Sequence, residues 1–281
     1  MPTSYNNGGC TVGPAREDPA TGQGPQANHR IAVPAETLII PDDRSHRRET
    51  TAATPSHVTT PVMLAWSGGK DSSLALARLN ADPNFRVCAL VTAVTTGYDR
   101  ISIHGVRRDL LERQAAAIGL PLIVAPLSAG APNAAYEEAW AAALAEGSAR
   151  FDGATHVAYG DLFLEDVRAY REAQLRGRGY TPVYPVWGEN TAALARGFVR
   201  AGFRAVLTCV DTTQLDAGFA GREFDAAFLN ELPATVDPCG ERGEFHTFVW
   251  DGPHMRNAVP VVAGERVLRD ERFQYCDFLP A

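Results

Sequence analysis

One short stretch of the sequence combines residue types that are suited to binding a polyphosphate. Ser67-Gly68-Gly69-Lys70-Asp71-Ser72 follows an apolar run and opens a segment with helical spacing. Adjacent glycines allow a tight turn that presents backbone N–H groups to an anion, and the following helix adds the positive end of its dipole. Serine hydroxyls supply further donors. The stretch therefore predicts a loop that binds nucleotide phosphates, and a plain glycine-rich turn is the alternative.

Lys70 is the only lysine in the chain, because the other 25 of its 26 basic residues are arginine. A single ammonium kept inside this loop indicates a role at the phosphates. The neighbouring Asp71 is expected to bind Mg²⁺ or to orient the loop, and the alternative is a helix cap. The loop is not a Walker A motif, since its glycines are adjacent and an aspartate follows the lysine.

Further polar residues follow predicted strands or lie in a C-terminal loop. Thr95 and His104 come after the second strand, and Asp161 ends a central one. Open α/β sheets bind ligands at the carboxyl ends of their strands. We expect Thr95 to hold the adenine or ribose edge through backbone groups, with a solvated loop as the alternative. Asp161 is expected to contact Mg²⁺ or substrate, unless it only forms a turn.

The C-terminal loop contains two glutamates and a histidine within six residues: Glu241, Glu244 and His246. Ammonium predominates over ammonia at neutral pH and is not nucleophilic, and a carboxylate can both attract it and accept its proton. This set favours an ammonia-binding end of the site, and a solvated, glycine-broken loop is the alternative. Cys239 lies in the same loop, but one cysteine and one histidine are too few for a structural zinc site.

Strand and helix patterns alternate along the chain up to about residue 210. The predicted strands are 62–66, 86–94, 122–127, 155–159 and 205–210, and the predicted helices are 72–80, 107–118, 133–146, 165–175 and 192–201. This alternation predicts an α/β fold with a parallel, Rossmann-like sheet and helices on both faces. A short helix at 223–230 and strands at 245–250, 259–262, 266–269 and 273–278 predict a smaller α+β part. The expected domains are a disordered leader (1–60), the nucleotide-binding part (61–211) and the C-terminal part (212–281).

Composition excludes several classes of protein. The chain has 281 residues, of which 45% are apolar, so it is neither disordered throughout nor fibrous. Its net charge of −7 disfavours a nucleic-acid binder. No apolar run is long enough to span a membrane. The five cysteines are widely spaced and lack a C-x-x-C pair, which favours a reducing, cytoplasmic location.

Taken together, the motifs resemble those of a known family. The S-G-G-K-D-S loop is similar to the signature of pyrophosphate-loop ATPases, also called N-type ATP pyrophosphatases or adenine nucleotide alpha-hydrolase-like proteins. Residues 98–107, Tyr159-Gly160-Asp161 and the D-P-C-G-E-R-G-E-F-H-T stretch at 237–247 narrow the resemblance to the diphthine–ammonia ligase family, with its diphthamide synthase domain. The resemblance covers residues 62–281. The arginine- and alanine-rich composition is typical of a GC-rich genome and favours a bacterial-type member.

This resemblance implies an ATP-dependent ligase. ATP adenylates a carboxylate, ammonia attacks the acyl-adenylate, and AMP and pyrophosphate are released. The family substrate in archaea and eukaryotes is diphthine, a modified histidine of translation elongation factor two, and bacteria lack that modification. No glutaminase unit is evident, so free ammonium is the expected nitrogen source.

The resemblance also assigns roles to individual residues. The implied phosphate-binding residues are Ser67, Gly68, Gly69, Lys70 and Ser72; the implied Mg²⁺ ligands are Asp71 and Asp161; the implied substrate residues are His104, Gly105 and Cys239; the implied catalytic residues are Lys70, Asp71, Glu241, Glu244 and His246.

Two other functions remain open at this point. One is an adenylating nucleotide- or tRNA-modifying enzyme of the same superfamily, and the other is a sensor that binds ATP without turnover. The role of four arginines also stays open. Arg168, Arg171, Arg176 and Arg178 would grip an anionic substrate or form a solvated helix face.

Overall fold

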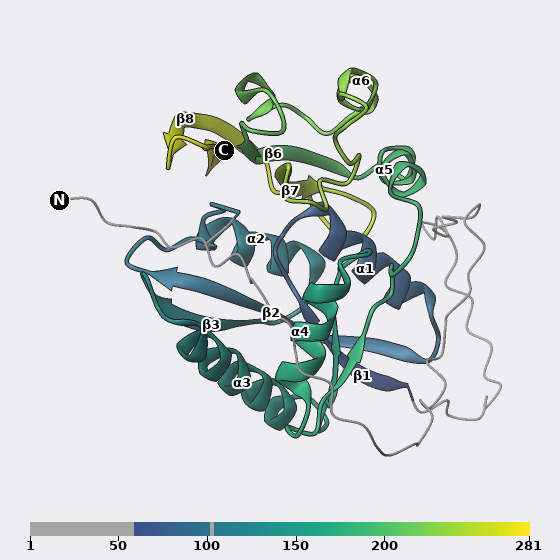
Figure 1. Ribbon diagram of the computed structural model, residues 1–281. Coiled ribbons are helices and arrows are strands. Elements are labelled where there is room, and N and C mark those ends of the chain that lie inside the picture. Colours follow the sequence, from purple (N-terminus) through teal and green to yellow (C-terminus); the bar gives the residue numbers. More distant parts are fainter. Residues whose placement is uncertain (1–58, 102–103) are drawn as a thin grey trace, which may run out of the picture. The chain divides into compact units, whose positions relative to one another are not determined.

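The computed structural model describes residues 59–101 and 104–281. Residues 1–58 of the expected leader lie outside this part of the chain. The first sheet has five parallel strands in the order β3-β2-β1-β4-β5 (Figure 1). Their bounds are β1 Thr60–Ala65, β2 Phe85–Thr96, β3 Leu122–Ser128, β4 His156–Ala158 and β5 Thr181–Val183. The chain builds outward from β1 to β3 and then returns to β4 on the other side of β1. The point between β1 and β4 is therefore the topological switch point, where such sheets bind ligands.

Helices cover both faces of this sheet, as predicted. In β1 the consecutive residues Val62, Met63 and Leu64 are all fully buried. Because successive side chains of a strand point to opposite faces, both faces must be covered. Val62 and Leu64 share a hydrophobic cluster with α1 (Lys70–Ala81) and α2 (Arg108–Ile118). Met63 belongs to a second cluster with α3 (Asn133–Arg150) and α4 (Glu165–Leu175) on the opposite face (Figure 1).

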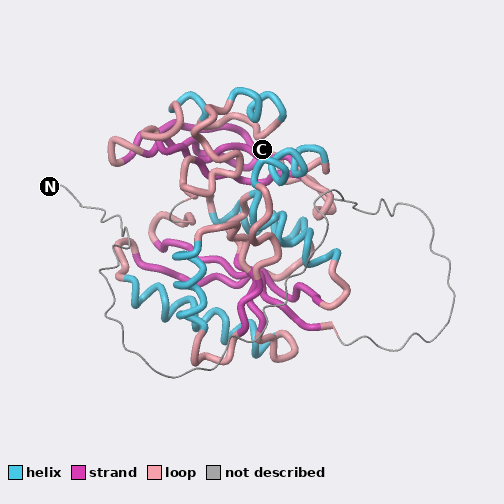
Figure 2. Tube along the Cα trace, turned by 45° about the vertical axis from the view of Figure 1, so that its right-hand side comes forward, coloured by secondary structure: helices cyan, strands magenta, loops and turns pink. Residues whose placement is uncertain are grey.

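A second, antiparallel sheet follows, with strand order β7-β6-β9-β8. Its strands are β6 Arg204–Asp211, β7 Phe245–Asp251, β8 Val261–Arg269 and β9 Phe273–Pro280. The accompanying helices are α5 Thr191–Arg200, the 3₁₀ turn η1 Ala217–Phe219 and α6 Ala226–Glu231. Figure 2 shows these helices as cyan coils beside the magenta strands.

The prediction that the strand at 205–210 belongs to the parallel sheet is wrong. That strand is β6, which pairs antiparallel with β7 and β9, so the second sheet begins before residue 212. Every residue of β6 after Arg204 is buried. A strand buried on both faces is a continuous apolar run in either kind of sheet, and the run therefore does not reveal its partners.

Strand β7 contacts the loop that follows β1. The backbone N–H of Val249 donates to the carbonyl of Gly68 (2.9 Å), and the N–H of Lys70 donates to Thr247 Oγ1 (3.1 Å). One hydrophobic cluster contains both Leu64 of β1 and Phe248 of β7. The second sheet thus helps to form the predicted phosphate loop. Within the described residues, no helix has the length and apolar character needed to cross a membrane.

Candidate active site

The predicted phosphate loop connects β1 to α1 at the switch point. Gly68 has φ +77°, a left-handed conformation that favours glycine, and a Cβ on Gly69 would lie 3.0 Å from the carbonyl oxygen of Thr247. Ser72 Oγ donates to the Gly69 carbonyl (2.9 Å), and Ser67 Oγ accepts from the Gly69 N–H (3.3 Å). Together these features make a tight turn whose donors gather at the N-terminus of α1.

Lys70, the single lysine, is only 2% exposed. Its Nζ donates to both carboxylate oxygens of Asp71, at 2.7 and 2.8 Å, and lies 5.7 Å from the ring centroid of Phe245. Burial alone would lower the pKa of Lys70, but the adjacent Asp71 carboxylate outweighs it and raises that pKa above 10.5. Lys70 therefore keeps a full positive charge inside the site at neutral pH.

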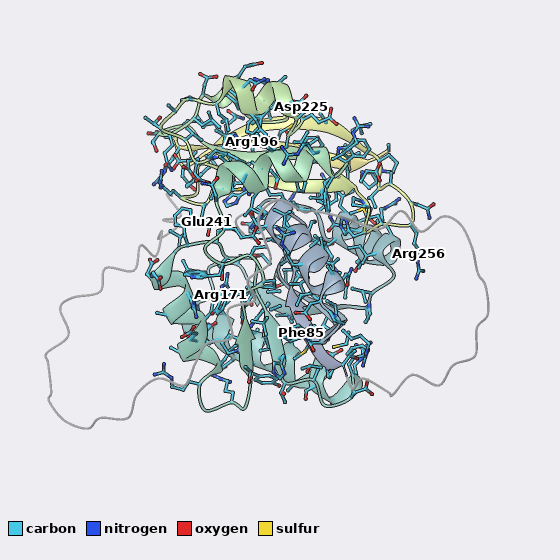
Figure 3. All side chains as sticks on the ribbon, turned by 90° about the vertical axis from the view of Figure 1, so that its right-hand side faces the viewer. Phe85, Arg171, Arg196, Asp225, Glu241 and Arg256 are labelled. Carbon is cyan, nitrogen blue, oxygen red and sulfur yellow. The ribbon has the colours of Figure 1, made fainter. Side chains whose placement is uncertain are left out.

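Glu241, which Figure 3 labels in the loop before β7, is close enough to Lys70 and Asp71 for their charges to affect it. Its Oε1 accepts a hydrogen bond from the backbone N–H of Leu162, at 2.8 Å. Burial raises the pKa of Glu241 to about 7, and the negative charges of Asp71 and Asp161 act in the same direction. A carboxyl group that titrates near neutral pH is suited to accept and return a proton.

Glu244 is bonded within its own loop. It is 1% exposed, and its two oxygens accept the backbone N–H groups of Asp237 (2.8 Å) and Arg242 (2.9 Å). These bonds lie within its own loop. Glu244 thus organises the loop that carries Glu241, and its predicted role at the ammonia end stays a prediction.

His246 of β7 and His104 of the loop after β2 come together, with ring centroids 4.4 Å apart. Burial lowers the pKa of His246 to about 4, with the positive charge of Lys70 adding to the effect. Burial, His246 and Lys70 likewise lower the pKa of His104, whose Nδ1 is buried without a hydrogen-bond partner among the described residues. Both imidazoles are therefore neutral at pH 7.

An unpredicted carboxylate holds the His104 loop in place. Asp277 of β9 accepts hydrogen bonds from Arg100 (2.6 Å) and from Arg107 (3.1 and 2.6 Å), one residue at either end of the loop. Gly105 has φ +65°, and a Cβ there would lie 2.8 Å from the ring of Tyr275. Gly105 thus lets the loop pass over β9, and its predicted contact with substrate is not tested by this arrangement.

Asp161 lies at the switch point but is bound to Arg171 of α4 by two hydrogen bonds, at 2.5 and 3.1 Å. The guanidinium of Arg171 stacks on the Tyr159 ring at 4.4 Å, and Arg168 lies 4.8 Å from the ring centroids of Tyr184 and Trp187. Arg176 and Arg178 are exposed. The arginine run therefore divides into a stacked, half-buried pair and a solvated pair.

The remaining predicted residues, Cys239 and Thr95, form hydrogen bonds with backbone groups of neighbouring segments. Cys239 is buried, donates through Sγ to the Thr191 carbonyl (3.3 Å), and has its pKa raised by burial to about 12, so it is a protonated thiol. Thr95 uses its backbone N–H and carbonyl in hydrogen bonds to Arg100 and Asp99. These are the backbone groups that were expected to hold the nucleotide.

The residues present fit a nucleotide with Mg²⁺. Mg²⁺ is usually held by one or two carboxylates together with substrate phosphates, so a preformed cluster of ligands is not required. Among the described residues, no group of three or more His, Cys, Asp or Glu side chains is placed to hold a metal. Asp71 sits at the loop with a side chain that is 32% exposed and meets this requirement. Asp161 meets it only if Arg171 releases it.

Two residues of this site escaped the sequence prediction, Thr247 and Gln114. Thr247 is the last residue of the 237–247 motif, and its hydroxyl oxygen accepts a hydrogen bond from the backbone N–H of Lys70. Gln114 on α2 is fully buried and bonds the Gly68 carbonyl at 3.0 Å. A glutamine inside an amphipathic helix gives no local sign that its amide contacts a loop 46 residues earlier.

Comparison with family models gives two matches that together cover most of the chain. The diphthamide synthase N-terminal domain matches residues 60–179, and the diphthamide synthase C-terminal domain matches residues 190–277. The first match spans the parallel sheet up to β4 together with α4, and the second contains β6, β7 and β8. A comparison with curated proteins finds no match.

Proposed function

The chain belongs to the diphthamide synthase family, and from this premise we propose that it is an ATP-dependent ligase that adenylates a substrate carboxylate and then aminates it with ammonia. The products are an amide, AMP and pyrophosphate. The observation that carries the proposal is the buried Lys70, which begins α1 directly after the glycine-rich loop at the switch point and lies close to Glu241. Such a reaction needs a positive group where the pyrophosphate leaves, which is Lys70. It also needs a proton acceptor where the amine attacks, which is Glu241.

At the phosphate end, the loop binds the β and γ phosphates through its N–H groups and hydroxyls. Lys70 offsets the negative charge that develops on the departing pyrophosphate, and preorganised donors of this kind are often the largest single term in catalysis. When bound, Mg²⁺ neutralises charge on the phosphates, and Asp71 is the residue that would hold it.

At the amine end, Glu241 accepts the proton that ammonium must lose before it attacks the acyl-adenylate. A carboxyl with a pKa of about 7 is partly ionised at neutral pH and takes this proton without a large energetic penalty. The neutral rings of His104 and His246 accept hydrogen bonds without adding positive charge. We assign them to the approach of the amine and of the substrate carboxylate.

Diphthine is the substrate that the family implies, and the substrate class we propose more broadly is a carboxylate on a small molecule or a modified protein residue. The adenylation step is tested as carboxylate-dependent exchange of labelled pyrophosphate into ATP, using fractions of an extract of the protein's own organism. We expect exchange with one fraction, and we expect Lys70→Met to lower it by about 10²–10³-fold. Glu112→Gln, an exposed change on α2, serves as the matched control.

The amination step is tested with isotope-labelled ammonium and mass analysis of the product. Incorporation of the label as an amide supports the ligase. An adenylated product that never takes up nitrogen supports the nucleotide- or tRNA-modifying alternative. Tight ATP binding without exchange in any fraction supports the sensor and contradicts the proposal.

A further inference from the structure

The side chain of Gln114 connects three segments that are distant in sequence. Trp66, at the end of β1, donates its indole N–H to Gln114 Oε1 (2.7 Å). Gln114 Nε2 donates to the carbonyls of Gly68 (3.0 Å) and Val249 (2.6 Å). The side chain is 0% exposed. A buried amide whose oxygen and both N–H groups are all used is held in one orientation.

The partners themselves fix which amide atom is which. An indole N–H is only a donor, and the two carbonyls are only acceptors, so exchanging the oxygen and nitrogen of Gln114 would break all three bonds. The network therefore acts directionally. It draws the carbonyl of Gly68 toward α2 and β7, where the backbone N–H of Val249 donates to the same oxygen at 2.9 Å.

This direction matters for the next residue. The Gly68–Gly69 peptide is trans, so its C=O and N–H point to opposite sides. Holding the Gly68 carbonyl toward α2 and β7 therefore turns the Gly69 N–H away from them, toward Ser67 Oγ and the N-terminus of α1. A peptide between two glycines flips easily, because glycine adopts either sign of φ without steric cost. A contact from outside the loop must therefore fix the orientation of the Gly68–Gly69 peptide.

We propose that Gln114 is a positioning residue for phosphate binding, which fixes the Gly68–Gly69 peptide so that the Gly69 N–H faces the phosphates. The proposal rests on the proposed function, in that this loop holds the polyphosphate of ATP. It adds a role for α2 and β7: the carbonyl of Val249 shares the amide of Gln114, so the second sheet sets the geometry of a loop in the first.

The test compares ligands with and without phosphates in the full chain. Binding of ATP, inorganic pyrophosphate and adenosine is measured by calorimetry for the wild type and for Gln114→Met, which keeps the volume and removes the amide. We expect ATP and pyrophosphate to bind about 10- to 100-fold more weakly, the size of one hydrogen bond to a charged group. Adenosine binding is expected to stay within twofold.

Three further variants separate positioning from stability. Gln114→Asn keeps an amide that is one methylene too short, and we expect the same selective loss if Gln114→Met does not fold. Trp66→Phe removes the indole donor together with part of the buried ring, while both bonds from Gln114 Nε2 remain available, so its loss of pyrophosphate affinity is expected to be smaller than that of Gln114→Met. Phe198→Leu shrinks a fully buried ring of the second part that stacks on Phe203. It is expected to lower stability while leaving binding of all three ligands unchanged.

The outcomes are distinguishable. Unchanged pyrophosphate binding in Gln114→Met and Gln114→Asn overturns the inference, and so does an equal loss of adenosine and ATP, which would make Gln114 merely structural. A wild type that binds ATP no better than adenosine, and does not bind pyrophosphate, contradicts the proposed function instead.

Discussion

At the scale of single residues, burial disfavours the charged form of both Lys70 and Glu241, but only at Lys70 does a counter-ion outweigh it. Lys70 is buried but keeps its charge, because the Asp71 carboxylate lies 2.7 Å from its Nζ. Among the described residues, no cation is bonded to Glu241 and its one hydrogen bond comes from the Leu162 backbone. Burial raises its pKa to about 7. Environments that move the pKa values of two titratable groups apart in this way suit one group to an electrostatic role and the other to proton transfer.

This arrangement predicts the titration of Glu241 in the free protein. With carboxyl-labelled glutamate and NMR, we expect one carboxyl signal to titrate with a midpoint of about 7 and to be absent in Glu241→Gln. In Asp71→Asn the midpoint is expected to fall, since the negative charge of Asp71 helps to raise it. A Glu241 midpoint in the ordinary glutamate range would remove its role as proton acceptor.

At the scale of elements, the end of β4 lies against the start of α1. A Cβ on Gly160 would lie 2.8 Å from the backbone carbonyl carbon and oxygen of Asp71, although Gly160 has no positive φ. The requirement for glycine is therefore one of space. Only a glycine lets the two segments that flank the switch point approach this closely.

We expect Gly160→Ala to push α1 away from β4, to lower the free energy of unfolding by about 1–3 kcal/mol, and to weaken ATP binding. Gly197→Ala in α5 is the matched control, because its Cβ would meet nothing within 4 Å. In a helix interior that change is expected to stabilise by about 0.5–1 kcal/mol. Denaturant unfolding and ATP titration of both variants test this expectation. If Gly160→Ala is as stable as Gly197→Ala and binds ATP equally well, the close contact with Asp71 does not require glycine at position 160.

The clamp on the His104 loop gives a pH-dependent prediction. Although burial alone would raise it, Arg100 and Arg107 hold the pKa of Asp277 at about 2. A lowered carboxyl pKa contributes stability above the unfolded value, and that contribution is lost as pH falls toward 2. We expect Asp277→Asn to lower the free energy of unfolding by about 1–2 kcal/mol at pH 7, with the difference shrinking at lower pH.

The control for this clamp is Asp152→Asn, because Asp152 and its partner Arg86 are largely exposed. An exposed ion pair contributes little to stability, so this variant should unfold like the wild type. The measurement is denaturant unfolding of both variants from pH 7 to pH 3. A pH-independent loss in Asp277→Asn would show that its charge does not matter.

Sequence reasoning predicted elements better than it predicted partners. The helix at 165–175 matches α4 residue for residue, because its polar and apolar positions follow one another with helical spacing. The three-residue strand β5 is too short to leave a pattern, and the sheet of β6 depends on partners far along the chain. In the site, residue types alone single out the glycine-rich loop, Glu241 and Glu244, whose catalytic roles stay predictions. The contacts of Asp277 and Gln114 could not be predicted, because they join segments far apart in the sequence.

At the scale of the whole molecule, the two sheets share one hydrophobic cluster and one loop. Leu64 of the first sheet and Leu207 and Phe248 of the second belong to the same cluster, and β7 donates a hydrogen bond to Gly68. Each sheet thus shares part of its buried apolar surface with the other. We therefore expect residues 59–281 to unfold as one cooperative unit.

Tryptophan fluorescence tests this cooperativity. Two single-tryptophan variants are compared. One retains only Trp140, which reports on α3 and the first sheet, and the other retains only Trp250 of β7. The expected result is a single denaturant midpoint shared by both reporters once the stability change of each variant is subtracted. Two separated midpoints would mean that the second sheet unfolds independently, and the loop geometry argued above would then not depend on it.

The central claim is that ATP is cleaved between its α and β phosphates to activate a carboxylate for ammonia. The most direct measurement is analysis of the nucleotide products formed from labelled ATP with Mg²⁺, ammonium and fractions of the organism's own extract. We predict AMP and pyrophosphate, dependent on ammonium and on one fraction, and lost in Lys70→Met. ADP and phosphate from the same mixture would contradict the account.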